Sequence, residues 1–215
     1  MNVYYNAEYT GAWKDAYPIS IGLIAENGKS LYLEFADVPL YAITPFVKEN
    51  VMCDTYLYDE EYASIADAIE AGKQNGKLRG YQYKITTEST ALQALNEWFE
   101  SLLEERPEET IQLVSYCCHY DACILYNLYR GNIPSYLNKV CYDIIGLVSS
   151  YETQKDPNRS LSDKLKVPYT DDDMILLADK LGMPIGNYEK DSSIRYAQII
   201  KNVYEGLQDF SKRYF

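Results

Sequence analysis

The stretch PISIGLIAENGKSLYLEF, residues 18–35, decides the fold of this 215-residue chain. Its first eight residues are nearly all apolar, which is typical of a strand in the centre of a sheet. Asn27-Gly28 is a strong hairpin signal, and residues 30–35 alternate as a returning strand. Because residues 3–9 also read as a strand, the chain is expected to open with an antiparallel three-stranded meander.

The rest of the chain alternates between helical and strand patterns. Apolar residues at helical spacing predict a helix over residues 87–105, which Pro107 ends. The other expected helices are near residues 45–51, 60–71, 120–129, 143–151, 174–181 and 192–210, and the other expected strands are residues 110–116 and 139–142. This order predicts one α/β domain over residues 1–215, with a mixed five-stranded sheet, an antiparallel meander plus parallel strands, flanked by helices.

Composition narrows the class of protein. The formal charge of -12 argues against a protein that coats nucleic acid, because neutralising phosphates needs clustered Lys and Arg. The 23 tyrosines suit a stacking surface or a protein interface, and a single histidine leaves oxygen ligands for any metal. No apolar run reaches the roughly 20 residues of a membrane span, so we expect a cytoplasmic protein with no membrane partner.

Four segments carry a family resemblance. They are YYNAEYTG at residues 4–11 with the hairpin that follows, SYCCHYD at 115–121, CYDII at 141–145 and KDSSIRYAQIIK at 190–201. In order and spacing they resemble the DEDD 3'-5' exonucleases of the ribonuclease H-like superfamily, in particular the compact bacterial and phage exoribonuclease-like group. The resemblance implies a ribonuclease H-like fold, and in family members it implies two-metal phosphodiester hydrolysis.

Several site positions depart from the family pattern. The family's Asp-x-Glu is Asn6 and Glu8 here, Asp121 matches the second aspartate, and Asp191 and Tyr196 stand where the family has His and Asp. An amide is a weak substitute for a bridging carboxylate, and a phenol is a poor magnesium ligand. Asp191 cannot supply the imidazole that acts as general base. If a metal binds, we expect Mg²⁺ or Mn²⁺ at Glu8 and Asp121.

Three aromatic side chains are candidates for nucleotide contacts. Trp13 and Tyr17 lie in the loop where related exonucleases contact the terminal base, and His119 lies beside Asp121. Their rings can stack on a base. Core packing, hydrogen bonding within the chain or simple exposure is the alternative interpretation of all three.

Two functional hypotheses follow, and a third is weaker. The first is a catalytically impaired or inactive exonuclease-like protein that binds a protein partner, a second copy, a nucleotide or a nucleic-acid end. The second is an active metal-dependent 3'-5' exonuclease with Glu8, Asp121 and either Asp191 or Asn6 around the ion. The third is a phage-encoded inhibitor or sponge on a nuclease scaffold. Whether Tyr196 lies in the ion pocket separates the first two.

Overall fold

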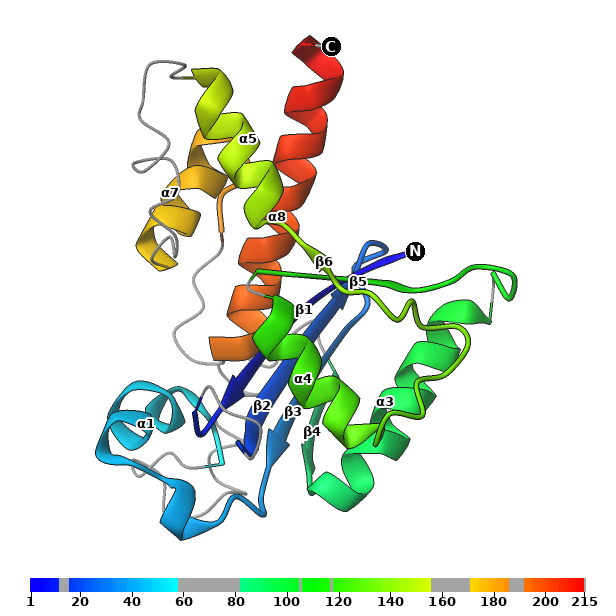
Figure 1. Cartoon of the computed structure of the whole chain (residues 1–215), viewed down its shortest axis with the longest axis vertical. Coiled ribbons are helices and arrows are strands. Elements are labelled where there is room, and N and C mark those ends of the chain that lie inside the picture. Colours follow the sequence, from blue (N-terminus) through cyan, green and yellow to red (C-terminus); the bar gives the residue numbers. More distant parts are fainter. Residues whose placement is uncertain are drawn as a thin grey trace.

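A mixed sheet with the strand order β4-β3-β2-β1-β5-β6 forms the centre of the molecule (Figure 1). The computed structural model describes residues 1–11, 16–57, 82–104, 106–116, 118–155, 171–185 and 192–214. The strands are β1 (Asn2–Tyr9), β2 (Pro18–Ala25), β3 (Ser30–Phe35), β4 (Gln82–Thr86), β5 (Gln112–Ser115) and β6 (Tyr142–Asp143). β2 runs antiparallel to both of its neighbours, and the β1–β5, β3–β4 and β5–β6 pairs are parallel.

The predicted meander is confirmed. All eight residues of β2 are buried, as its apolar run indicates. At the hairpin, the Ala25 N–H donates to the Lys29 carbonyl over 2.8 Å, and Gly28 has a φ of 86°. Glycine tolerates this left-handed conformation without steric cost.

The predicted strand count is wrong by one, since β4 adds a sixth strand. β4 pairs in parallel with β3, in a register that places Leu31 opposite Gln82. Most of its side chains are exposed or half-buried, as expected of an edge strand. The sequence QYKIT lacks the apolar run that marked the central strands, because an edge strand buries little of its surface.

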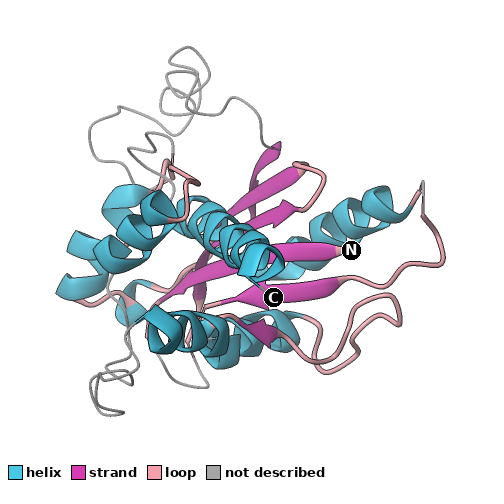
Figure 2. Ribbon diagram, turned by 90° about the horizontal axis from the view of Figure 1, so that it is seen from above, coloured by secondary structure: helices cyan, strands magenta, loops and turns pink. Residues whose placement is uncertain are grey.

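Helices cover both faces of the sheet (Figure 2). α3 (Glu88–Leu103) and α4 (Cys118–Leu128) share a core with one face, and α8 (Ser192–Tyr214) crosses the other, with α5 (Ile145–Lys155) and α7 (Asp171–Lys180) against it. The short elements η1 (Leu40–Ala42), α1 (Pro45–Asn50) and η2 (Met52–Asp54) follow β3. The predicted helices are confirmed with shifted ends, except that residues 60–71 lie outside the described residues.

The start of α8 rests directly on β2. A Cβ atom at Gly22 would lie 2.4 Å from backbone atoms of Ser193 and Ile194, so only glycine allows this approach. On the same face of the sheet, Asn6 lies opposite Gly22 and Glu8 lies opposite Ser20. The closeness of helix and strand therefore fixes the first turns of α8 beside the end of β1.

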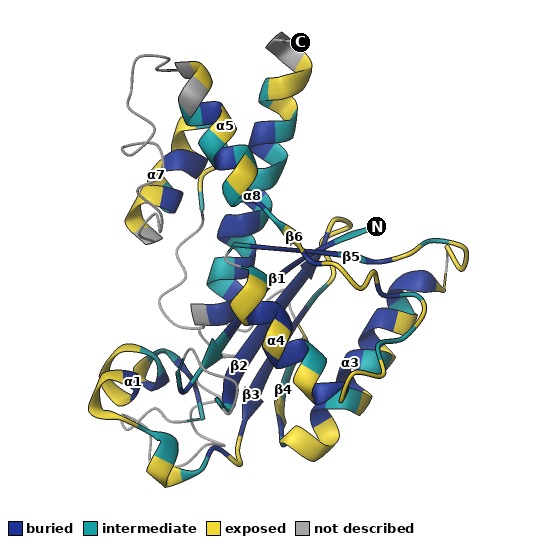
Figure 3. Ribbon diagram, viewed as in Figure 1, coloured by how far each residue is buried: buried dark blue, intermediate teal, exposed yellow. Residues whose placement is uncertain are grey.

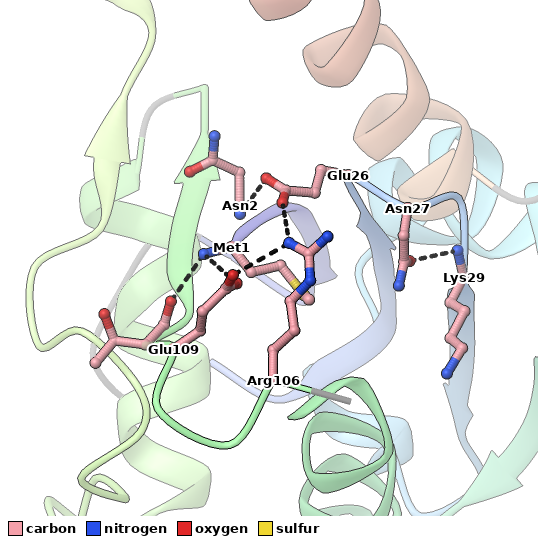
Figure 4. Close-up of polar contacts among 8 residues, drawn as sticks. Met1, Asn2, Glu26, Asn27, Lys29, Arg106 and Glu109 are labelled. Carbon is pink, nitrogen blue, oxygen red and sulfur yellow. Dashed lines mark hydrogen bonds and ion pairs between the residues drawn. The ribbon is translucent and has the colours of Figure 1, made fainter. Parts of the chain in front are cut away.

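Ion pairs hold the opposite end of β1 (Figure 4). Arg106 Nη1 lies 3.1 Å from Glu109 Oε1 and 3.9 Å from Glu26 Oε1. The Met1 amino group lies 3.4 Å from Glu109 Oε2, and the Asn2 N–H donates to Glu26 Oε2 over 2.9 Å. Opposite charges alternate around this end of the strand.

No helix in the described part of the chain is long and apolar enough to cross a bilayer.

Candidate functional site

Two adjoining cavities lie at the carboxyl end of β1, each of about 460 Å³. We name them the α8 cavity and the α4 cavity after the helices that contribute to each. The residues that line both are Asn6, Glu8, Phe46, Val51 and Tyr116. Figure 1 shows the end of β1, α1 and the start of α8 at the same end of the molecule. Cavities of this size are typical of small-ligand sites.

The α8 cavity contains Asn6 and Tyr196, two of the three residues that depart from the family pattern. Asn6 and Glu8 come from β1 and Tyr196 from the second turn of α8, where Ile199 and Ile200 extend the wall. Tyr196 is half-buried. The period-2 geometry of β1 places Asn6 and Glu8 on the same face, which is the face that α8 covers. A phenol and an amide therefore share the cavity with the Glu8 carboxylate.

Asp121 lies in the α4 cavity together with Asn6 and Glu8. Its side chain is almost completely buried, and it accepts hydrogen bonds from the Ser115 hydroxyl and the Ala7 N–H. Burial, with a smaller contribution from the negative charge of Asp143, raises the pKa of Asp121 to about 7. A substantial fraction of Asp121 is therefore neutral near physiological pH.

Asp143 is not among the described residues that line either cavity, but its hydrogen bonds hold the neighbouring helix starts in place. Its carboxylate accepts from the Cys118 N–H over 3.1 Å and from the Ile145 N–H over 2.9 Å. It thus caps the first turns of both α4 and α5. Acidic side chains at helix N-termini are stabilising. The start of α4, which carries Asp121, is held in place by this contact.

Three buried oxygens near the site have no hydrogen-bond partner in the described part of the molecule: Asn6 Oδ1, Ser20 Oγ and Ser193 Oγ. Ser20 and Ser193 are fully buried. All three surround Gly22, since Asn6 lies opposite it, Ser193 contacts it and Ser20 lies two residues away on the same face. Unpaired buried polar groups are rare in native proteins, and this concentration sets the region apart from the rest of the sheet.

Glu34, one strand beyond Ser20, shows the opposite arrangement. It is fully buried, and its carboxylate accepts from the hydroxyls of Tyr32 (2.7 Å) and Tyr83 (2.9 Å) and from the N–H groups of Tyr56 (2.9 Å) and Leu57 (2.7 Å). Burial raises the pKa of Glu34, while these hydrogen bonds lower it. Four donors match the capacity of an ionised carboxylate, so this group has a structural role.

The other predicted contact residues lie around the cavities or outside the described residues. The Tyr17 carbonyl accepts from the Thr10 N–H, and the Tyr17 N–H donates to the hydroxyl of Thr10, which lines the α4 cavity. The Tyr17 ring meets the Tyr41 ring edge-on at 6.1 Å. His119 is exposed on α4, stacks on Tyr120 at 4.1 Å and is absent from the described linings of both cavities. Trp13 and Asp191 lie outside the described residues.

The polar and aromatic lining residues that were not predicted as site residues include Phe46, Asn50, Asp54 and Tyr116. Phe46 and Asn50 come from α1, Asp54 from η2, and Tyr116 directly follows β5. Tyr116 could have been found, because the residue after a parallel strand often faces a site at the sheet's carboxyl edge. Nothing in the sequence around Phe46, Asn50 or Asp54 marks them, since their position depends on how the β3–β4 connection folds back over β1.

Three carboxylates line the cavities among the described residues: Glu8 in both, Asp54 in the α8 cavity and Asp121 in the α4 cavity. Of the predicted metal ligands, Glu8 lines both cavities, and the Asp121 carboxylate accepts a hydrogen bond from Ser115. Asn6 and Tyr196 are neutral. Among the described residues, no group of three His, Cys, Asp or Glu side chains is placed to hold one ion. Two-metal chemistry needs several ionised carboxylates around the ions.

No protein-family model matches the sequence, and no curated protein matches it either. The resemblance to DEDD exonucleases therefore rests on the quoted motifs alone. The sheet, with its antiparallel meander and flanking helices, is compatible with a ribonuclease H-like fold.

Proposed function

We propose that this chain is a ribonuclease H-like protein that binds a ligand in the cavities at the end of β1 and does not hydrolyse phosphodiesters. The observation that carries the proposal is the presence of Tyr196 in one cavity with Asn6 and Glu8. In the resembling family, carboxylates at all three of these positions hold the metal ions, and Glu8 is the one that this chain retains. Here a ring and an amide take the places of the other two.

The physical reason is the loss of negative charge at two of the family's metal-binding positions. An amide oxygen ligates a divalent ion only weakly, and a phenol adds no negative charge at neutral pH. The cavities themselves are retained, with aromatic, amide and carboxylate side chains in their walls. A site that keeps its volume but loses its ion ligands supports binding rather than hydrolysis.

One observation favours the alternative, an active metal-dependent 3'-5' exonuclease with a rearranged site. Asp54 adds a second carboxylate to the α8 cavity, beside Glu8. In that account Asp54 replaces a lost family carboxylate, and Asn6 completes the ligand set. We favour the binding function because Tyr196 lies in the same cavity.

The test is degradation of labelled single-stranded RNA and DNA in Mg²⁺ and in Mn²⁺. The parent chain is compared with Glu8→Ala, with Asp54→Asn and with the double variant Asn6→Asp, Tyr196→Asp. We expect no trimming by the parent and metal-dependent trimming by the double variant, because it regains two carboxylates.

The variants also separate the two functions. Metal-dependent trimming by the parent that Glu8→Ala abolishes would contradict the binding function. If Asp54→Asn abolished it too, Asp54 would be the replacing ligand. Glu49→Gln, an exposed carboxylate on α1, is the matched control and should behave as the parent.

A further inference from the structure

Two free cysteines meet where the start of α4 packs beside the residue before β6. Cys118 is the first residue of α4, and Cys141 directly precedes β6. Cys118 Sγ lies 3.7 Å from the Cys141 carbonyl oxygen, and the two thiols are hydrogen-bonded to each other. Neither cysteine is among the described residues that line the two cavities. Two thiols side by side meet the first geometric requirement for a disulfide bond.

The fold holds the two thiols together from both sides. The Asp143 carboxylate accepts from the Cys118 N–H over 3.1 Å, which fixes the start of α4 against β6. The Tyr142 ring meets the Tyr204 ring of α8 at 6.1 Å, so Tyr142 faces α8. Because side chains alternate along a strand, Cys141 faces the opposite side of the sheet, where it shares a core with Cys118. Figure 3 shows buried and exposed residues alternating along α4 on this side.

The two thiols differ in how easily a reagent reaches them. Cys118 is half-buried, whereas Cys141 is 8% exposed. A small reagent therefore meets Cys118 first, and Cys141 lies next to it as the second thiol, which is the arrangement in which a modified cysteine is resolved to a disulfide. Burial raises the pKa of both thiols, so little thiolate is present near neutral pH, and we expect closure of the pair to be slow there.

We propose that Cys118 and Cys141 are a redox-sensitive pair, which a small-molecule disulfide such as glutathione disulfide converts to an internal disulfide. The Cys118 thiolate attacks one sulfur of the reagent, which forms a mixed disulfide and releases one glutathione thiolate. The Cys141 thiolate then attacks the Cys118 sulfur and releases the second. Two protein thiols are oxidised, the reagent disulfide takes up two electrons, and the two thiol protons go to the released glutathiones. No cavity residue takes part, so this reaction is independent of the proposed function.

The bond would fasten the start of α4 to the edge of the sheet. Residues 118 and 141 enclose a loop of about 24 residues, which contains the rest of α4. Closing a loop restricts the unfolded chain and thereby stabilises the folded one. Asp121 lies one turn further along α4 and lines the α4 cavity, so the bond would also fix one wall of that cavity.

Equilibration of the full chain in mixtures of reduced and oxidised glutathione tests the proposal. A pH of about 8.5 provides enough thiolate for exchange. Remaining thiols are then alkylated, and the digested protein is analysed by mass spectrometry without reduction. We expect a link between the peptides that contain Cys118 and Cys141, which dithiothreitol reverses. The oxidised protein should melt about 5 °C or more above the reduced protein.

Variants assign the link to these two residues. Cys118→Ser and Cys141→Ala should each abolish both the link and the rise in melting temperature. Cys117→Ser, at the neighbouring position, and Cys123→Ser, which replaces an exposed cysteine of α4, are the matched controls and should retain both. Circular dichroism shows whether each variant is folded. If the buried Cys141→Ala is not, the half-buried Cys118→Ser decides the result by itself.

Four outcomes would overturn the proposal. One is the absence of the link at equilibrium with glutathione disulfide. Another is a link that Cys117→Ser abolishes and Cys118→Ser retains, which would assign the reactive thiol to Cys117. Disulfide-linked dimers in place of the internal link would assign the reactivity to exposed cysteines. A link that leaves the melting temperature unchanged or lowers it would show that the bond does not fasten the native fold.

Discussion

On the sheet face that α8 covers, Glu8 on β1, Ser20 on β2 and Glu34 on β3 form one row across three strands. Its two ends differ. Glu34 is fully buried and accepts four hydrogen bonds from the surrounding tyrosines and backbone. Glu8 opens into two cavities, and the oxygens of Ser20 and the neighbouring Asn6 have no partner among the described residues.

The contrast distinguishes a structural role from a functional one. A polar group whose hydrogen bonds are all satisfied within the fold stabilises a single arrangement, as at Glu34. Of the unpaired groups, Asn6 lines both cavities, where a ligand could satisfy its amide oxygen, whereas Ser20 and Ser193 are not among the described residues that line either cavity. We therefore place structure in the β3 half of this face and function in the β1 half. Four predictions test this division.

The largest effect is expected at the border between the halves. Gly22→Ala forces a Cβ atom against the Ser193 and Ile194 backbone, which lies 2.4 Å from its position. Because backbone cannot rotate away as a side chain can, we expect a loss of about 4 kcal/mol in the free energy of unfolding. Urea titration measures it. Gly146→Ala is the matched control, since nothing lies within 4 Å of a Cβ there, and its stability should not fall.

Glu34→Gln tests the structural half. The glutamine side chain carries an NH2 group where Glu34 has an acceptor oxygen. This NH2 group would face donors that now bond to Glu34, so at least one buried donor loses its partner. We expect a loss of about 3 kcal/mol in the free energy of unfolding. The exposed Glu49→Gln should cost less than about 0.5 kcal/mol. Equal effects of the two variants would contradict a structural role for Glu34.

Asp121 on the functional side gives a pH dependence. Its folded pKa of about 7 lies above the ordinary aspartate value, so the folded state holds more protons than the unfolded state between about pH 4 and 7. This contribution to stability is complete below pH 4 and is lost as the pH rises through 7. Between about pH 4 and 7, the free energy of unfolding should therefore fall by about 1 kcal/mol per pH unit less in Asp121→Asn than in the parent.

Unfolding of Asp121→Asn is measured by urea titration at several pH values. Glu34 contributes a slope of the same sign, because its pKa is raised as well, so some decline should remain in the variant. Asp172→Asn, on the exposed start of α7, is the control and should retain the full slope. Identical slopes in the parent and Asp121→Asn would show that this carboxyl does not titrate in the window.

The smallest effect has the opposite sign. Ser20→Ala and Ser193→Ala each remove a buried hydroxyl without a partner, so each should raise the unfolding free energy by about 1 kcal/mol. Ser115→Ala is the matched control, because this buried serine donates to Asp121 and its loss should destabilise the fold. A loss of stability in Ser20→Ala would indicate that an internal water satisfies this hydroxyl.

The sequence predicted the parts of the fold that depend on local pattern. The apolar run of β2 and the helical stripe of α3 specify buried elements by themselves, and both are present. β4 was missed because an edge strand carries no such run. In the site, Asn6, Glu8, Asp121 and Tyr196 were singled out by the family resemblance, and the structure brings them to two adjoining cavities.

Phe46 and Asp54 could not be predicted in the same way. Their segment follows β3 in the chain but folds back to the end of β1, and no periodicity in residues 36–57 indicates that contact. Asp121 was predicted as a metal ligand, and its burial against Ser115 became visible only in the packed structure. Long-range packing, rather than local propensity, determines these features.

The central claim is that the end of β1 holds a binding cavity without a hydrolytic metal centre. Mn²⁺ binding by calorimetry tests it most directly, with the parent, Glu8→Ala and the double variant Asn6→Asp, Tyr196→Asp measured side by side. We predict saturable binding by the double variant at Mn²⁺ concentrations where the parent and Glu8→Ala show none. Binding of about two Mn²⁺ ions by the parent, lost in Glu8→Ala, is what two-metal hydrolysis requires and would contradict the claim.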